Sequence, residues 1–161
     1  MANLNNIFNP LFLKDKELKI AFELLFFVIK DFDKNISSLL KKFGYNKTHF
    51  AVIFLASNNN YLTIKDLLII LDIKKQSLAK VLNKLKNNDL IVLKQSKKDK
   101  RNKNIYLTKK GKKIEKRLTE KQMNNIANAY KNAGTDSINS FKKILINLIS
   151  KNSKTILKKK I

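Results

Sequence analysis

One stretch, residues 90–108, constrains the fold of this chain more than any other part of the sequence. Two short β-like runs, Leu90–Leu93 and Ile105–Thr108, flank a polar, lysine-rich run that spans Ser96–Asn104. Two such runs around a polar turn are typical of a β-hairpin. Two short amphipathic segments joined by a tight turn come directly before this hairpin, and that order predicts a helix–turn–helix followed by a wing.

Helices account for most of the remaining chain. Gly occurs three times and Pro once, so chain breakers are scarce and their positions mark boundaries. Asp15, Thr63 and Asp136 are expected N-caps, and Asp66 completes a capping-box-like pattern with Thr63. Apolar residues at three- and four-residue steps predict helices over about 15–43, 46–57, 64–71, 75–87, 109–133 and 136–149. The expected fold class is therefore mainly α, or α+β with a small β-hairpin wing.

The first of these helices is apolar on more than one face. A helix of that kind must be covered on several sides, which one small domain does not offer, so we expect a partner chain. We treat residues 1–161 as one domain with three parts. Residues 14–45 and 109–150 form a helical dimerisation region, 46–108 form the winged helix–turn–helix region, and 151–161 form a basic tail that is expected to fray.

The charge of the chain favours a polyanionic partner. Lys and Arg number 35 against 12 acidic residues, a net charge of +23, which suits nucleic acid or an anionic membrane surface. The longest apolar stretch is far below the roughly 20 residues that span a bilayer, so we expect a cytoplasmic protein without a membrane partner. With one His, no Cys and no Gly-rich phosphate loop or paired carboxylates, we expect no metal, no cofactor and no enzyme activity.

The helix over 75–87 is the candidate recognition helix, because the second helix of a helix–turn–helix meets base edges with its N-terminal turn. Gln pairs with adenine through two hydrogen bonds, and Lys reaches guanine or phosphate. An ordinary amphipathic helix with a solvated basic face is the alternative. The candidate DNA contacts are Lys74, Lys75, Gln76, Ser77, Lys80 and Lys84.

The polar run of the hairpin is the second candidate DNA contact. Only two cations of the 35 are Arg, and the planar guanidinium of Arg101 suits a narrow groove of negative potential. Asp99 either orients Arg101 or stabilises the turn. The alternative is a solvated hairpin tip. The candidate wing residues are Lys97, Lys98, Asp99, Lys100, Arg101 and Lys103.

Aromatic residues suggest a small-molecule cleft between the helical base and the DNA-reading part. Phe26, His49, Phe50 and Phe54 are the candidates. The same residues are also suited to the core, and for His49 packing or helix capping is the competing explanation. Their spacing does not separate these options.

Taken together, these motifs resemble the MarR family of winged helix–turn–helix regulators. Asp99-Lys100-Arg101 is similar to the D-x-R of the family's wing, and Leu107–Gly111 is similar to the L-T-x-x-G that follows it. The resemblance implies a homodimer in which the first and the last two helices of each chain interleave. Glu23–Phe27 and Asp66–Leu71 also resemble the PetP-like subgroup. Asp89 stands where the family often has Gly, a residue that adopts left-handed backbone more readily.

We therefore expect a sequence-specific DNA-binding transcriptional regulator that acts as a homodimer on a pseudo-palindromic operator. A small-molecule effector is an open addition to this expectation. Two alternatives remain: a nucleoid-type DNA-binding protein of low sequence specificity, and an RNA-binding winged-helix module. The ratio of specific to nonspecific affinity separates the first alternative from the expected function, and competition between duplex DNA and structured RNA separates the second.

Overall fold

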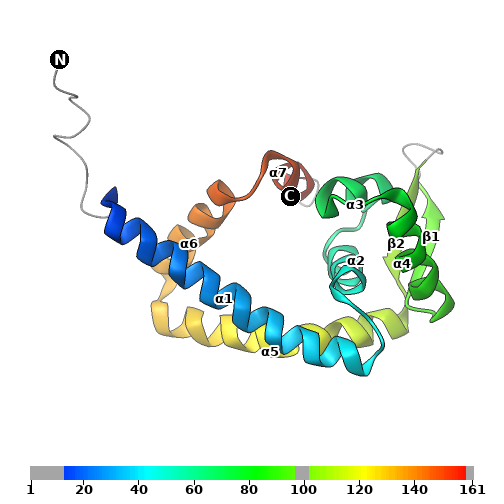
Figure 1. Cartoon of the computed structure of the whole chain (residues 1–161), viewed down its shortest axis with the longest axis horizontal. Coiled ribbons are helices and arrows are strands. Elements are labelled where there is room, and N and C mark those ends of the chain that lie inside the picture. The colour runs from blue at the N-terminus through cyan, green and yellow to red at the C-terminus, as the bar shows by residue number, and fades with distance from the viewer. Residues whose placement is uncertain (1–12, 97–101, 159–161) are drawn as a thin grey trace, which may run out of the picture.

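The computed structural model describes residues 13–96 and 102–158. A lobe of short elements lies at one end, and the long helices α1 and α5 extend from it toward α6 (Figure 1). The mainly α fold with a β-hairpin is confirmed. Its elements are α1 (Asp15–Lys42), α2 (Lys47–Asn58), α3 (Ile64–Leu71), α4 (Lys75–Asn87), β1 (Ile91–Gln95), β2 (Lys103–Leu107), α5 (Lys109–Ala133), α6 (Thr135–Leu148) and α7 (Lys151–Lys158).

The predicted capping box at the start of α3 is confirmed. The hydroxyl of Thr63 accepts a hydrogen bond from the Asp66 amide at 3.1 Å, and the Asp66 carboxylate accepts one from the Thr63 amide at 3.0 Å. The other two predicted caps are wrong. Lys14 and Gly134 occupy those N-cap positions, and Asp15 and Asp136 lie in the first turn of their helices. A carboxylate in the first turn still interacts favourably with the helix dipole, which explains why both sites look like caps.

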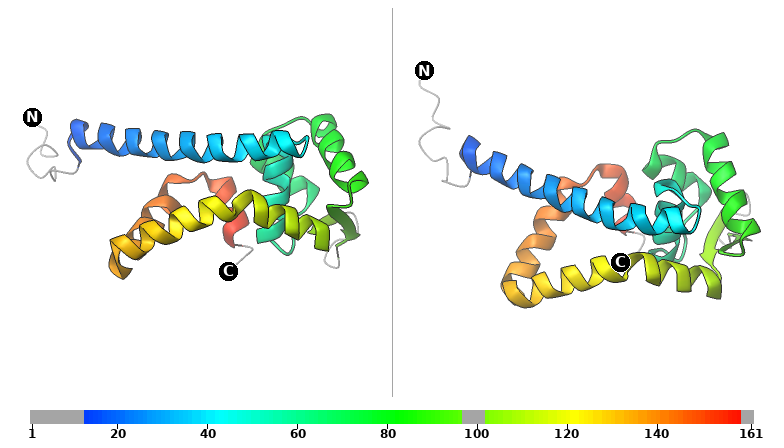
Figure 2. Two further views of the ribbon diagram at one scale, coloured as in Figure 1. Left: turned by 90° about the horizontal axis from the view of Figure 1, so that it is seen from below. Right: turned by 60° about the horizontal axis from the view of Figure 1, so that its bottom comes forward.

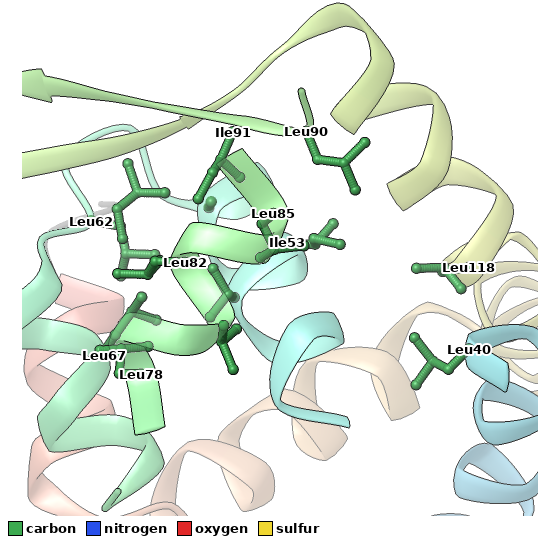
Figure 3. Packing of buried hydrophobic residues seen from close by; sticks show 14 residues of the cluster. Leu40, Ile53, Leu62, Leu67, Leu78, Leu82, Leu85, Leu90, Ile91 and Leu118 are labelled. Carbon is green, nitrogen blue, oxygen red and sulfur yellow. The ribbon is translucent and has the colours of Figure 1, made fainter. Parts of the chain in front are cut away.

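The lobe has a continuous apolar core. Leu67, Leu78 and Leu85 are buried completely or nearly so, and they come from the two helices of the helix–turn–helix. Ile53 of α2 and Ile91 of β1 join them (Figure 3). The cluster continues to Leu40 of α1 and Leu118 of α5 and so reaches the helical base. Burial of this many large aliphatic side chains is the main force that closes the lobe.

The hairpin is attached to the lobe at both ends. β1 and β2 pair antiparallel from Ile91 opposite Leu107 to Gln95 opposite Lys103. The amide of Ile105 donates to the Leu62 carbonyl at 2.9 Å, so the loop before α3 adds a further connection to β2. This backbone hydrogen bond ties β2 to the loop that leads into the helix–turn–helix.

The L-T-x-x-G motif, Leu107–Gly111, joins the hairpin to α5, and there the backbone of α5 passes close to the backbone at Leu90. The Thr108 hydroxyl accepts from the Gly111 amide at 2.9 Å and donates to the Asp89 carbonyl at 2.7 Å. A Cβ on Gly111 would lie 2.0 Å from the Leu90 carbonyl oxygen, so only Gly fits there. Asp89 itself has φ 55°, which confirms that the position where the family often has Gly is left-handed in this chain as well.

The helical base contrasts with the lobe. Leu40 is the buried residue of α1, and every residue of α6 is at least partly exposed. Large apolar side chains remain open along both helices, among them Phe22 at 74% and Leu148 at 61% exposure. Figure 2 shows that α1 and α5 project as long arms away from the lobe. None of the helices within residues 13–96 and 102–158 is long and apolar enough to cross a membrane.

The expectation that residues 151–161 fray is wrong for most of that segment. Residues 151–158 form α7, which packs against α3. Ile156 is only 8% exposed because it lies against the Asn59–Leu62 turn and the start of α3. The lysine-rich composition suggested a solvated tail, but α7 is amphipathic and buries Ile156 on its apolar side.

Candidate nucleic-acid interface

The α4 helix separates its apolar and cationic side chains cleanly. Its buried face carries Leu78, Val81, Leu82 and Leu85. The structure places all six predicted recognition-helix residues on the other side, exposed to solvent: Lys74, Lys75, Gln76, Ser77, Lys80 and Lys84. Lys74 is the N-cap residue, and its side chain makes no capping bond. The N-terminal turn of α4 therefore presents polar side chains outward.

A tight turn fixes the angle at which α4 leaves α3. Asp72, the C-cap residue of α3, has φ 46° and ψ 50°, and its amide donates to the Leu68 carbonyl at 3.1 Å. Asp is one of the few non-Gly residues that adopt left-handed backbone at modest cost. Leu67 and Leu78 on either side of the turn are buried in the same core. The cationic face of α4 is thus held on a two-helix unit with a shared core.

Only the strand ends of the wing are described. Lys103 begins β2 and is exposed, and the Ser96 amide donates to the Asn102 carbonyl at 2.9 Å beyond the last strand pair. Sequence reasoning did not select Lys94, an exposed cation on β1 whose ammonium lies 5.8 Å from the centre of the Tyr106 ring. The predicted wing residues that lie outside the described residues are Lys97, Lys98, Asp99, Lys100 and Arg101.

A groove runs between the first turn of α2 and the exposed face of α4. Sequence reasoning did not predict it, although the Asn at the start of α2 followed three residues later by His is a recognisable capping pattern. The groove gathers polar residues of α2 beside three predicted recognition residues. It is lined by Asn46, Thr48, His49, Ile73, Ser77, Lys80, Val81 and Lys84.

His49 is buried at this groove and caps α2. Asn46 Oδ1 accepts from the His49 amide at 3.1 Å, and the Asn46 amide donates to His49 Nδ1 at 3.3 Å. Burial, and to a smaller degree the charge of Lys84, lowers the pKa of His49 below its ordinary value. Lys84 Nζ donates to the Gly44 carbonyl at 2.5 Å and lies 5.7 Å from the centre of the Tyr45 ring. These contacts confirm helix capping as one role of His49.

The four residues of the predicted ligand cleft are not all brought together. Phe50 and Phe54 stack on each other with 5.6 Å between ring centres, and both are half-buried. Phe26 is 56% exposed on α1, and His49 lines the groove with α4 instead. A cleft that uses Phe50 and Phe54 stays a prediction. Within residues 13–96 and 102–158, no group of His, Cys, Asp and Glu is placed to hold a metal ion.

Known proteins share both the sequence pattern and the architecture. The family described as MarR family matches residues 34–102. The transcriptional regulator PetP of Rhodobacter capsulatus is 31% identical over 135 residues, which cover 84% of this chain and 81% of PetP. The crystal structure of NadR with 4-hydroxyphenylacetate is similar in fold, with a TM-score of 0.65 at 21% identity over 77% of this chain and 88% of NadR. A Staphylococcus aureus MepR mutant bound to an oligodeoxyribonucleotide gives a TM-score of 0.50 at 19% identity, over 85% and 90% of the two chains.

Proposed function

This chain belongs to the MarR family of winged helix–turn–helix transcriptional regulators, and we propose that it acts as a homodimer on a pseudo-palindromic operator. The observation that carries this proposal is the exposed face of α4, where six polar or cationic residues stand opposite a fully apolar buried face. No acidic residue interrupts α4, which is described over its whole length. In this arrangement Lys75, Gln76 and Ser77 reach base edges, and Lys80 and Lys84 contact phosphates.

The open apolar faces of the base support the homodimer. Phe22, Ile29 and Leu24 of α1 are each more than half exposed, as are Ile144 and Leu148 of α6. Large apolar side chains left exposed on two helices favour an interaction site in a protein that carries so much charge elsewhere. A second copy offers the same surface, and a two-fold axis then sets two α4 helices about one helical turn of DNA, ~10 bp, apart.

The wing contributes the second contact of each lobe. We assign Arg101 to the minor groove beside the half-site, where its weakly hydrated guanidinium fits the negative potential of a narrow A·T-rich segment. The cations Lys97, Lys98, Lys100 and Lys103 would then neutralise the flanking phosphates. Lys103 is exposed at the base of the hairpin, as this role requires.

A small-molecule effector is the remaining part of the proposal. NadR is known in complex with 4-hydroxyphenylacetate, which is a precedent for small-molecule binding on this fold. In this chain Gln122 of α5 is only 4% exposed, and neither atom of its side-chain amide has a hydrogen-bond partner among the described residues. Buried amides are normally paired, so Gln122 is suited to meet a ligand or a second copy of the chain.

The decisive test is the specificity ratio for DNA. Sites would be selected from a random duplex pool, and the best site would be titrated against its shuffled sequence at physiological salt. A regulator should prefer its site by at least ~10³-fold and bind as two chains per palindrome. A ratio near one would favour a nucleoid-type protein, to which the net charge of +23 also corresponds. Stronger binding to structured RNA than to any duplex would overturn DNA recognition.

A further inference from the structure

We propose that the groove between the first turn of α2 and the exposed face of α4 is a binding site for a phosphate group. The groove is a distinct feature of the lobe, because it joins two helices that are separated in sequence by α3. Thr48 and His49 line it from α2, and Ser77, Lys80 and Lys84 line it from α4. Lys80 and Lys84 are the ionised side chains of this described lining, so the groove is positive.

A buried nitrogen without a partner is the strongest sign of a missing ligand. His49 is only 7% exposed, and its Nε2 atom has no hydrogen-bond partner among the described residues. Leaving such an atom unpaired costs free energy, and buried polar atoms in native structures are nearly always satisfied. His49 is one of the residues that line the groove, and a group bound there would supply the missing partner.

The surroundings of His49 select an acceptor with negative charge. Nδ1 of the ring lies 2.6 Å from Asn46 Oδ1. Because Nδ1 accepts the Asn46 amide in the capping box, the neutral ring carries its proton on Nε2, and this nitrogen is a hydrogen-bond donor. The neighbours Tyr45 and Lys84 hold no negative charge that would satisfy it from within the lobe. A bound anion would accept from Nε2 and would raise the pKa of the ring by offsetting the charge of Lys84.

The backbone of α2 adds further donors. The amides of Lys47 and Thr48 belong to the first turn, where amide groups have no acceptor within the helix. The partial positive charge at a helix N-terminus and these outward amides favour phosphate in particular. The hydroxyls of Thr48 and Ser77 add two more hydrogen-bonding groups from opposite sides. A tetrahedral oxyanion with several acceptor oxygens fits donors that converge from two helices better than a planar carboxylate does.

The chain provides its own probe, because His49 is its only histidine. The imidazole carbon and nitrogen resonances of the full-length protein therefore report on this groove without assignment. Inorganic phosphate would be added to the free protein, with potassium chloride at the same ionic strength as the control. We expect a saturable shift of the His49 resonance and a rise of its pKa in phosphate but not in chloride. A linear response, or an equal response to chloride, overturns the proposal.

Two variants of matched charge locate the site. Lys84→Gln removes a cation from the groove lining, whereas Lys86→Gln removes an exposed cation of the same helix that does not line the groove. Lys84→Gln should weaken phosphate binding about tenfold, the effect of one charge-assisted hydrogen bond, and Lys86→Gln should leave it within about twofold. If both variants weakened phosphate binding equally, phosphate affinity would depend only on the net charge of the protein, and the proposed site would be wrong. Ser77→Ala, which changes no charge, gives an independent check in the same assay.

The last arm separates the two sources of phosphate, a DNA backbone and a small molecule. A duplex of random sequence would be added in chloride buffer, followed by inorganic phosphate. If the groove takes a backbone phosphate, the duplex alone reproduces the His49 shift and phosphate then competes with DNA more strongly than chloride does. If it takes a small molecule, the phosphate-induced shift persists on the DNA complex. The phosphate titration contains no DNA, so its failure is distinct from a failure of the proposed function.

Discussion

The winged helix lobe and the helical base solve the same problem of apolar burial in different ways. In the lobe, Leu67 and Leu85 have no exposed surface, and short helices close around them within one chain. In the base, α1 and α6 leave Phe22, Ile29 and Ile144 largely exposed. The lobe therefore buries its apolar core within one chain, whereas the base leaves large apolar side chains open. The comparison supports the proposed homodimer, in which each chain contributes one DNA-reading lobe and assembly through the base would set the spacing of the two lobes.

Leu85→Ala tests the self-contained core of the lobe and should have the largest effect. Leu85 is fully buried, so the change should cost about 2–5 kcal/mol in the free energy of unfolding through lost burial and a cavity. Leu24→Ala, at a side chain 61% exposed on α1, is the matched substitution in the base. Urea unfolding of both variants at low and high protein concentration checks this. A Leu24→Ala cost that equals that of Leu85→Ala at every concentration would contradict the comparison.

Phe22→Asp combined with Ile29→Asp tests the open face of the base. Two carboxylates in the proposed interface should leave a folded monomer and weaken operator binding at least ~100-fold, which corresponds to about 2.7 kcal/mol. Sedimentation and an operator titration measure the two effects. Lys16→Gln with Lys34→Gln lowers the net charge by the same amount on exposed positions of the same helix and should preserve the dimer. A double Asp variant that still sediments as a dimer would refute the proposed interface.

Arg101→Ala tests whether the lobe depends on its wing. Loss of a specific groove contact should weaken operator binding by roughly 1–3 kcal/mol, with little change in the melting temperature. Arg101→Lys should recover only part of that loss, because ammonium is more strongly hydrated.

Arg117→Ala is the control for Arg101. The guanidinium of Arg117 lies 5.3 Å from the centre of the Phe43 ring, so this change should cost some stability, on the order of 0.5–1 kcal/mol, but little operator affinity. Equal operator affinities of the wild type and Arg101→Ala would remove the wing from the mechanism.

The smallest effect concerns pH. The folded state lowers the pKa of His49 through burial and through Lys84, so the unfolded chain binds a proton more readily near its ordinary pKa of about 6.5. Stability is then complete above that pH and decreases as the pH falls through it. His49→Gln keeps a residue able to complete the capping box and should reduce this dependence. Thermal melts of the wild type and of His49→Gln at about pH 7.5 and 5.5 measure this dependence. An equal drop in melting temperature in the two proteins would contradict the role of His49.

Local sequence patterns predicted most elements of the fold, including features of the site. Thr63 and Asp66 lie three residues apart, so their capping box depends on local geometry alone. The alternation on α4 likewise predicted which side chains are buried and which face solvent. The caps at Asp15 and Asp136 were wrong because several acidic or polar residues near a helix start satisfy the same preference. The match to PetP and the MarR family confirms the resemblance that the wing motif carried.

The sequence by itself determined the order of α1 to α6 and of the two strands, the two faces of α4 and the strong positive charge, because periodicity, capping and composition act over a few residues. Only the tertiary structure decided which distant residues meet. Lys84 reaches Gly44 across 40 positions, Gly111 is required by the backbone of Leu90, and Ile156 places α7 against the lobe. These contacts depend on the packing of whole elements around a shared core, and no local pattern encodes the distance between such elements.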